Sequence, residues 1–169
     1  MANRTRLTNT SFIVLGLVER ASEATPYDLK GMLEASVGNF WSISHSQLYA
    51  ESERLAAAGY LDERRERTSR RRRIYSLTAK GGEGLSHWRE EQTDALPELR
   101  DVSLLKLFMG ADPRPLAAAQ LEAHERKLAG YFELAAADDG QPPRGPWQAL
   151  EAGIAHERVW VQFWSNLAA

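Results

Sequence analysis

Three closely spaced helix starts, followed by a change of period, constrain the fold more than any other feature of this sequence. The first precedes an apolar run at 12–18, with Thr10 or a neighbour as its cap. Thr25 opens the second, with Pro26 in the first turn, and Ser44 opens the third. Because apolar residues at helical spacing follow each cap, the N-terminal part of the chain is predicted to hold three helices.

The pattern then alternates as a hairpin does. Gly59 suits the left-handed end of the third helix, and segments 61–66 and 71–77 flank a short polar turn. Thr78 caps a further, long helix, predicted to run through Leu99 with an interruption at Pro97; the residues at near-heptad spacing on it are Leu85, Trp88, Gln92, Ala95 and Leu99. This is the chain order of a winged helix-turn-helix, in which the third helix enters the major groove of DNA and the hairpin, or wing, lies along the flanking backbone.

The C-terminal half is predicted to be helical. A short apolar helix ends at Gly110, Asp112 starts a longer one, and the last helix begins near Trp147. Both long helices carry seams of residues spaced three and four apart, as packed helices do. We expect a mainly α protein with a small β-hairpin: a winged helix-turn-helix domain at 1–82 and a C-terminal antiparallel helical dimerisation domain, with a possible effector site, at 83–169.

Charge is divided unequally between these two parts. Residues 1–82 carry 13 Lys and Arg against 9 Asp and Glu, whereas 83–169 carry 8 against 14, so a net charge of −2 hides +4 and −6. Seven arginines fall within 64–73, opposed there only by Glu66. The alternative to a binding role is a solvated hairpin, but that would not need such self-repulsion. The run therefore favours contact with phosphates.

Composition and missing motifs exclude several classes. With 43% hydrophobic and 26% charged residues the chain is of ordinary globular composition, and its longest apolar run is far shorter than the roughly 20 residues of a membrane span. The chain has no cysteine and no secretory signal pattern, so we expect a cytoplasmic protein. Phosphate loops, nucleophile elbows and clustered histidines are lacking, so neither enzymatic activity, nor a metal, nor a cofactor is expected.

Several segments carry a resemblance to a known family. They are Pro26-Tyr27-Asp28-Leu29-Lys30, Phe40-Trp41-Ser42-Ile43-Ser44, Gln47-Leu48-Tyr49, Glu53-Arg54-Leu55 with Gly59-Tyr60-Leu61, Arg73-Ile74-Tyr75-Ser76-Leu77-Thr78 and Leu105-Lys106-Leu107-Phe108-Met109-Gly110. In order and spacing they resemble the PadR family of bacterial transcriptional regulators. Two positions depart from the family pattern: Ala50 replaces a usual proline, and Ser46 replaces a frequent glycine. The resemblance implies a dimeric repressor released from its operator by a small, often aromatic or cationic molecule.

Candidate DNA contacts lie around the third helix and the wing. By resemblance, Tyr27 and Tyr49 would donate to phosphates, while Gln47 or His45 would read base edges, with adenine the natural partner of Gln47. Capping alone would equally explain Ser44 and Gln47. The predicted DNA-binding residues are Tyr27, Ser42, Ser44, His45, Ser46, Gln47, Tyr49, Arg70, Arg71, Arg72 and Arg73.

The helical seams supply candidate subunit contacts. Those predicted are Phe12, Leu85, Trp88, Leu121, Leu128, Tyr131, Ile154, Val161 and Trp164. Trp88, Trp160 and Trp164 are also candidates for an aromatic effector pocket, with plain packing as the alternative, and Trp41 is expected in the core. His124 and Glu157 are polar interruptions of the seams, either edge or satisfied core residues or a ligand-contacting pair.

Two function classes remain open. The first is a homodimeric DNA-binding transcriptional regulator, with an inverted-repeat operator in double-stranded DNA, a second copy of the chain and a small aromatic or cationic effector as partners, and no membrane. The second is a winged-helix protein–protein interaction module that does not read DNA. The arginine-rich wing favours the first class, because an interaction module has no need of it.

Overall fold

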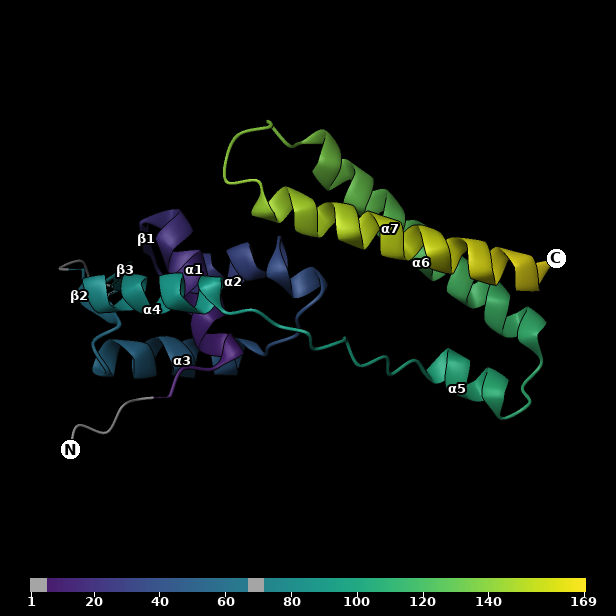
Figure 1. Ribbon diagram of the computed structural model, residues 1–169, viewed down its shortest axis with the longest axis horizontal. Coiled ribbons are helices and arrows are strands. Elements are labelled where there is room, and N and C mark those ends of the chain that lie inside the picture. The colour runs from purple at the N-terminus through teal and green to yellow at the C-terminus, as the bar shows by residue number, and fades with distance from the viewer. Residues whose placement is uncertain (1–5, 67–71) are drawn as a thin grey trace. The chain divides into compact units, whose positions relative to one another are not determined.

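The computed structural model describes residues 6–66 and 72–169. The chain forms two compact units, Met1–Asp94 and Ala95–Ala169 (Figure 1). The domain boundary expected at 82/83 differs from this division, because it would cut a helix that lies wholly in the first unit.

Three helices form the N-terminal part of the first unit, and each begins at a hydroxyl cap as predicted. Thr8, a neighbour of Thr10, caps the first helix, and Thr25 and Ser44 cap the next two. All three caps are reciprocal capping boxes, completed by the polar residue three places later. The helices are α1 Asn9–Ala21, α2 Pro26–Glu34 and α3 His45–Ala57, with a 3₁₀ turn, η1 Val37–Asn39, between α2 and α3.

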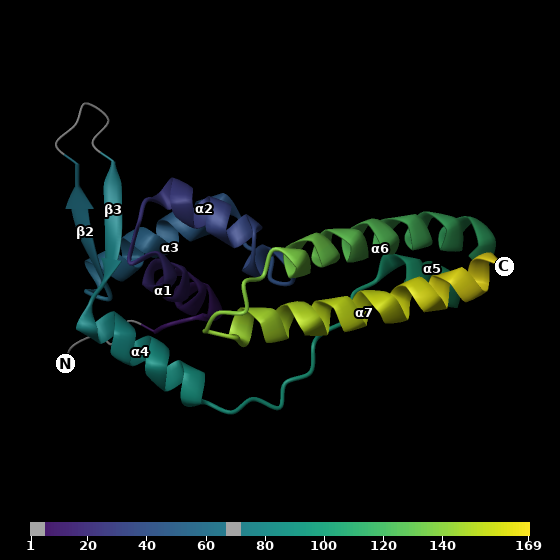
Figure 2. The same cartoon turned by 90° about the horizontal axis from the view of Figure 1, so that it is seen from above.

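The predicted hairpin is present and belongs to a three-stranded antiparallel sheet (Figure 2). Strand β2, Leu61–Arg65, pairs with β3, Arg73–Leu77, so that Arg65 lies opposite Arg73. Strand β1, Glu23–Ala24, pairs with the other side of β3. The sequence analysis did not predict β1, because two residues are too short to show an alternating pattern. Arg70 and Arg71 lie outside the described residues.

Helix α4, Ala79–Glu90, is shorter than predicted. Thr78 caps it as expected, but Glu91 already has an extended backbone, and no described residue between 91 and 101 is helical. The prediction that the helix runs through Leu99 is therefore wrong. Two features explain the early end: Thr93 and Asp94 are poor helix formers, and Pro97 disfavours a helical conformation at the residue before it.

One apolar core joins the elements of the first unit. It gathers Leu15 of α1, Leu29 of α2, Leu48 of α3, Tyr75 of β3 and Leu85 of α4. Because α3 buries its Leu48 face in this core, its opposite, polar face is left to solvent.

Trp41 is not part of that core, contrary to the expectation. It lies between η1 and α3, 41% exposed, and its backbone N–H donates to the carbonyl of Val37 at 2.8 Å. The apolar character of a tryptophan gave no means of telling a core residue from one in a surface loop.

The second unit consists of α5 Val102–Phe108, α6 Pro113–Ala136 and α7 Gly145–Ala168, of which α6 and α7 pack against each other as an antiparallel pair (Figure 2). Asp112 caps α6, and Gly110 ends the α5 segment with a φ of 88°, as predicted. Gly153 lets α7 approach α6, because a Cβ there would lie 3.0 Å from the ring of Tyr131. Within the described part of the chain no helix is long and apolar enough to span a membrane.

Candidate nucleic-acid interface

The first turn of α3 presents a polar surface. Ser42, Ser44, His45, Ser46 and Gln47 are all exposed, as is Tyr49 two residues further on. The buried residues of the helix, Leu48, Ser52 and Leu55, follow a spacing of four and three, so the helix is held on one side only. The free N–H groups of its first turn and the helix dipole make this end suited to an anion.

The side chains in this turn already form hydrogen bonds, with one another and with α2. The Oε1 atom of Gln47 accepts from the backbone N–H of Ser44 at 3.0 Å, and the Oγ of Ser44 accepts in return from the N–H of Gln47 at 3.2 Å. His45 Nε2 lies 2.9 Å from a carboxylate oxygen of Glu34 on α2. A bidentate contact from Gln47 to adenine would need Oε1, which the cap occupies, so base reading by Gln47 competes with capping.

Tyr27 lies in the first turn of α2, where it is 78% exposed. Its neighbour Asp28 closes the cap of that helix, and hydrogen bonds from the side chain and backbone of Thr25 hold the pKa of Asp28 below its usual value. The positive charge of Arg72 on the wing adds to this effect. The start of α2 therefore lies within electrostatic reach of Arg72.

The described arginines of the wing differ in how they are paired. Arg64 donates to Glu23 of β1 at 2.8 Å, and Arg65 donates to Glu63 at 3.0 Å. Arg73 contacts both Glu53 of α3 and Glu63 of β2. Arg72 is exposed and has no carboxylate within ion-pair distance among the residues that the structure describes. Of the predicted set Arg70 to Arg73, the first two residues lie outside the described part of the chain. Of the other two, Arg73 is paired with carboxylates and Arg72 is not.

A part-buried hydrogen-bonded group joins α3 to α1, and it was not predicted from the sequence. Glu51 accepts from Arg54 at 2.6 and 2.8 Å and from the hydroxyl of Ser11 in α1. The hydrogen bond from Arg54, with that from Ser11, lowers the pKa of Glu51 despite its partial burial. The spacing of Glu51 and Arg54 was a visible signal, whereas the long-range partner Ser11 had none.

Several predicted subunit and effector residues lie inside the single chain instead. Leu85, Tyr131 and Trp164 are buried at 1%, 6% and 0% exposure, so they pack the two cores and have no surface left for a partner. Phe12 and Trp88 stack on each other, with ring centroids 4.6 Å apart, within the first unit. The remaining predicted contacts keep exposed surface and stay predictions: Phe12, Trp88, Leu121, Leu128, Ile154 and Val161.

The two polar interruptions of the α6 and α7 seams meet. Glu157, 2% exposed, lies 2.5 Å from Nδ1 of His124 and 3.3 Å from Nζ of Lys127. His124 stacks on Trp160, whose indole N–H donates to His156 at 2.8 Å. This is a satisfied polar cluster between two helices. Among the described residues no group of three His, Cys, Asp or Glu side chains is arranged to hold a metal ion.

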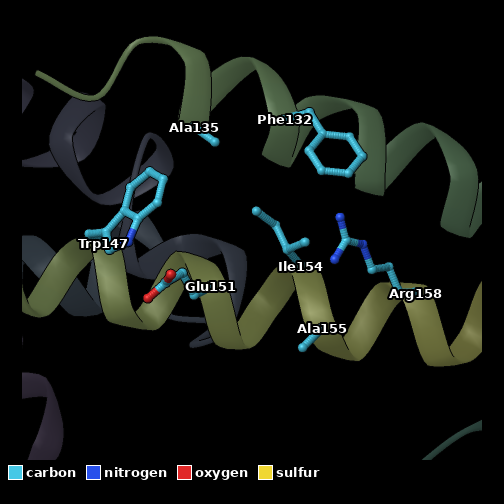
Figure 3. A pocket seen from close by; sticks show the side chains of 7 residues that line it. All are labelled: Phe132, Ala135, Trp147, Glu151, Ile154, Ala155 and Arg158. Atoms are coloured by element: carbon cyan, nitrogen blue, oxygen red, sulfur yellow. The ribbon is translucent and has the colours of Figure 1, made fainter. Parts of the chain in front are cut away.

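A cavity of about 410 Å³ opens between α6 and α7 (Figure 3). The rings of Phe132 and Trp147 form its apolar walls, and Arg158 places its guanidinium 5.5 Å from the centre of the Phe132 ring. None of Trp88, Trp160 and Trp164 lines it. The sequence signal for it, a polar stripe at 151 and 158 beside the seam, was overlooked. The lining residues are Phe132, Ala135, Trp147, Glu151, Ile154, Ala155 and Arg158.

Comparison with known proteins agrees with this arrangement. Residues 14–87, which span the three helices, the hairpin and most of α4, match the model of the transcriptional regulator PadR-like family. The negative transcriptional regulator PadR of Bacillus subtilis (strain 168) is 25% identical to the chain over 173 residues, 94% of each protein. Residues 14–87 therefore form a PadR-like domain.

Solved structures extend the likeness in fold to both units. Bacillus subtilis PadR in complex with operator DNA superposes with a TM-score of 0.81 at 23% identity, over 94% of this chain and 96% of that one. The complex of B. subtilis PadR with p-coumaric acid gives 0.76 at 23% identity over 97% of both chains. These matches confirm the predicted fold of a winged helix-turn-helix followed by a helical C-terminal part.

The two departures from the PadR-family pattern lie on the exposed side of α3. Ser46, in place of the glycine, has its Oγ 3.0 Å from the Oγ of Ser44, so it joins the capping cluster. Ala50 follows the exposed Tyr49 and is itself exposed. Both positions therefore alter the polar surface and leave the core untouched.

Proposed function

We propose that this PadR-like regulator binds double-stranded DNA as a homodimer and represses transcription. The observation that carries the proposal is the exposed polar first turn of α3 beside a wing that bears arginines, in a family of transcriptional regulators. Repression is proposed because the B. subtilis relative is a negative regulator. Such a role takes place where the chromosomal DNA is, in the cytoplasm, and requires no catalysis.

Each part of the surface has a proposed task. Tyr27 and Tyr49 donate to phosphates, and the arginines of the wing, Arg70, Arg71 and Arg72, contact the flanking backbone. Ser42, His45 and Ser46, at and just before the start of α3, contact base edges. Gln47 does so only if its side chain leaves the hydrogen bond with the backbone N–H of Ser44. A dimer would place two such helices on an inverted repeat, with half-sites one or two helical turns apart.

The cavity between α6 and α7 is the proposed effector site. Its walls suit a planar aromatic ring, and Arg158 suits a carboxylate. Glu151 lies two helical turns from Arg158, about 10.5 Å along the axis, and can accept from a hydroxyl at the far end of the molecule. The relative that binds p-coumaric acid, an aromatic acid with such a hydroxyl, supports this class of effector. Binding is proposed to release the DNA.

Selection from randomised duplexes with the full chain tests DNA binding. The expected result is enrichment of an inverted repeat, bound with an affinity that falls steeply with salt. A chain that enriches no sequence and binds duplexes without salt dependence would instead be the protein–protein interaction module.

Calorimetric titration with p-coumaric acid tests the effector site. Arg158→Gln is expected to weaken binding of the acid about tenfold or more, because it removes a charge-assisted hydrogen bond. Arg126→Gln is the matched control, since Arg126 lies on the exposed face of α6 in an ion pair with Glu122. Equal weakening in both variants would contradict the assignment of the cavity.

A further inference from the structure

The face of the β2–β3 hairpin that packs on the core at Tyr75 carries a row of charged side chains. In the β2–β3 register Glu63 lies opposite Tyr75 and Arg65 opposite Arg73, and residues two apart on a strand share a face. Tyr75 is fully buried, so this is the face that packs on the helices of the first unit. Beyond Tyr75 the same face carries Glu63, Arg65 and Arg73.

This row of side chains ends on α3. Arg65 donates its Nε–H to Glu63 at 3.0 Å, and the Nε of Arg73 lies 3.7 Å from the same carboxylate oxygen. Arg73 Nη1 reaches a carboxylate oxygen of Glu53, on α3, at 2.5 Å. Arg73 is therefore engaged on two sides, once within the hairpin and once with the helix that is proposed to enter the groove.

We propose that Arg73 is a positioning residue, which fixes the wing relative to α3 through Glu53 and Glu63 and does not itself contact phosphate. The inference rests on the DNA-binding function proposed above and changes the role first expected for Arg73. A phosphate would meet a guanidinium whose charge two carboxylates already offset. Arg72, the next residue, has no such ion pair in the described part of the chain and is left to the DNA backbone.

Glu53→Gln is an informative variant, because a charge effect and a positioning effect change the affinity for operator DNA in opposite directions. A carboxylate beside DNA repels phosphates, so Glu53→Gln should tighten binding to every duplex if the residue acts only through its charge. If Glu53 holds Arg73 and thereby the wing, the same change should weaken binding to the operator relative to other duplexes. A single exposed ion pair adds little to folding stability, so the effect should appear in DNA discrimination and leave thermal melting unchanged.

The experiment measures Kd of the full chain against KCl concentration for two duplexes, the selected inverted repeat and a scrambled duplex of equal length. Arg73→Gln and Glu53→Gln are each expected to lower the ratio of the two affinities about tenfold, and the double variant no further, as coupled residues do. The salt slope of Arg73→Gln should stay at the wild-type value. Arg72→Gln should lose about 0.9 of slope while keeping the ratio.

Two further variants complete the test. Asp62→Asn is the charge-matched control for Glu53→Gln, since Asp62 is exposed on the opposite face of β2, and it should leave the ratio unchanged. Arg73→Lys keeps the charge but lacks the planar fork that reaches both carboxylates, so it should lose discrimination as Arg73→Gln does.

Three outcomes separate the possibilities. A salt slope lowered by about 0.9 in Arg73→Gln, with both duplexes weakened alike, would make Arg73 a phosphate ligand and overturn the inference. An operator affinity that rises in Glu53→Gln would overturn it as well. If the wild-type chain shows no preference between the duplexes, it is the proposed function that fails.

Discussion

Glu51 is a carboxylate drawn into the contact between α1 and α3, and its protonation state bears on the position of the DNA-facing helix. Its two oxygens accept from Arg54 and Ser11, which favours the charged form and lowers the pKa in the folded chain. A carboxyl group with a lowered folded pKa stabilises the fold above its unfolded pKa, about 4.3, and this contribution is lost as the pH falls through the folded value.

Replacement of Glu51 by Gln should therefore cost stability at neutral pH and remove part of the acid sensitivity. We expect a loss of about 1–2 kcal/mol at pH 7, because charge-assisted hydrogen bonds are lost. The difference between wild type and variant should shrink as the pH is lowered below about 4.3, the unfolded pKa. Urea unfolding followed by circular dichroism across this range measures it. Glu125→Gln, on the exposed side of α6, serves as the control, and a constant difference at all pH values would contradict the assignment.

Glu157 is a carboxylate of the second unit that also accepts hydrogen bonds between two helices, and it is buried more deeply than Glu51. Its contacts to His124 and Lys127 are the polar link across the α6–α7 pair. Glu157→Ala should destabilise the protein by about 1–3 kcal/mol, because His124 loses its hydrogen-bond partner at a partly buried site. Thermal melting of the full chain provides the measurement. A change below 1 kcal/mol would show that the cluster is dispensable for packing.

At the scale of elements, neighbouring glycines at the start of α4 should respond in opposite directions. A Cβ on Gly81 would lie 2.2 Å from the backbone carbonyl oxygen of Tyr60, whereas one on Gly82 would meet only a methyl group of Leu77 at 3.7 Å. Gly81→Ala should therefore destabilise by about 1–3 kcal/mol through overpacking. Gly82→Ala should stabilise by about 0.5–1 kcal/mol, the helix propensity gain of alanine. Chemical unfolding of both variants checks the difference, and equal signs would refute it.

Local signals made most elements predictable. Thr25 and Ser44 cap their helices through chemistry contained within four residues, so the sequence alone located α2 and α3. The end of α4 was missed because the near-heptad spacing of Trp88, Gln92 and Ala95 was weighed above the weak helix propensity of Thr93 and Asp94.

Long-range contacts were out of reach of the same reasoning. The pairing of β1 with β3, the bond between Ser11 and Glu51, and the walls of the cavity join residues far apart in the chain. Spacing along one segment carries no information on which other segment will pack against it. For the DNA interface, the polar turn of α3 could be named in advance, but the bonds that engage Gln47 and Arg73 could not.

At the scale of the whole molecule, the proposed homodimer is the property to measure first. The chain has a mass of 19.0 kDa, so light scattering of the purified protein should give about twice that value. A duplex that carries one inverted repeat should bind two chains, because each half-site takes one α3. One chain per duplex, or a monomer at micromolar concentration, would contradict the proposal.

The order of the sheet has a consequence for handling the protein. Strand β2 is the last strand in the order β1-β3-β2, so its outer edge has no strand partner among the described residues. Bare edges invite strand addition by other molecules and hence aggregation, which alternating charges resist. Asp62, Glu63, Arg64 and Arg65 line this edge. These four charges thus act as solubilising gatekeepers, and variants that neutralise any of them, the control Asp62→Asn included, should be checked for monodispersity before any affinity is interpreted.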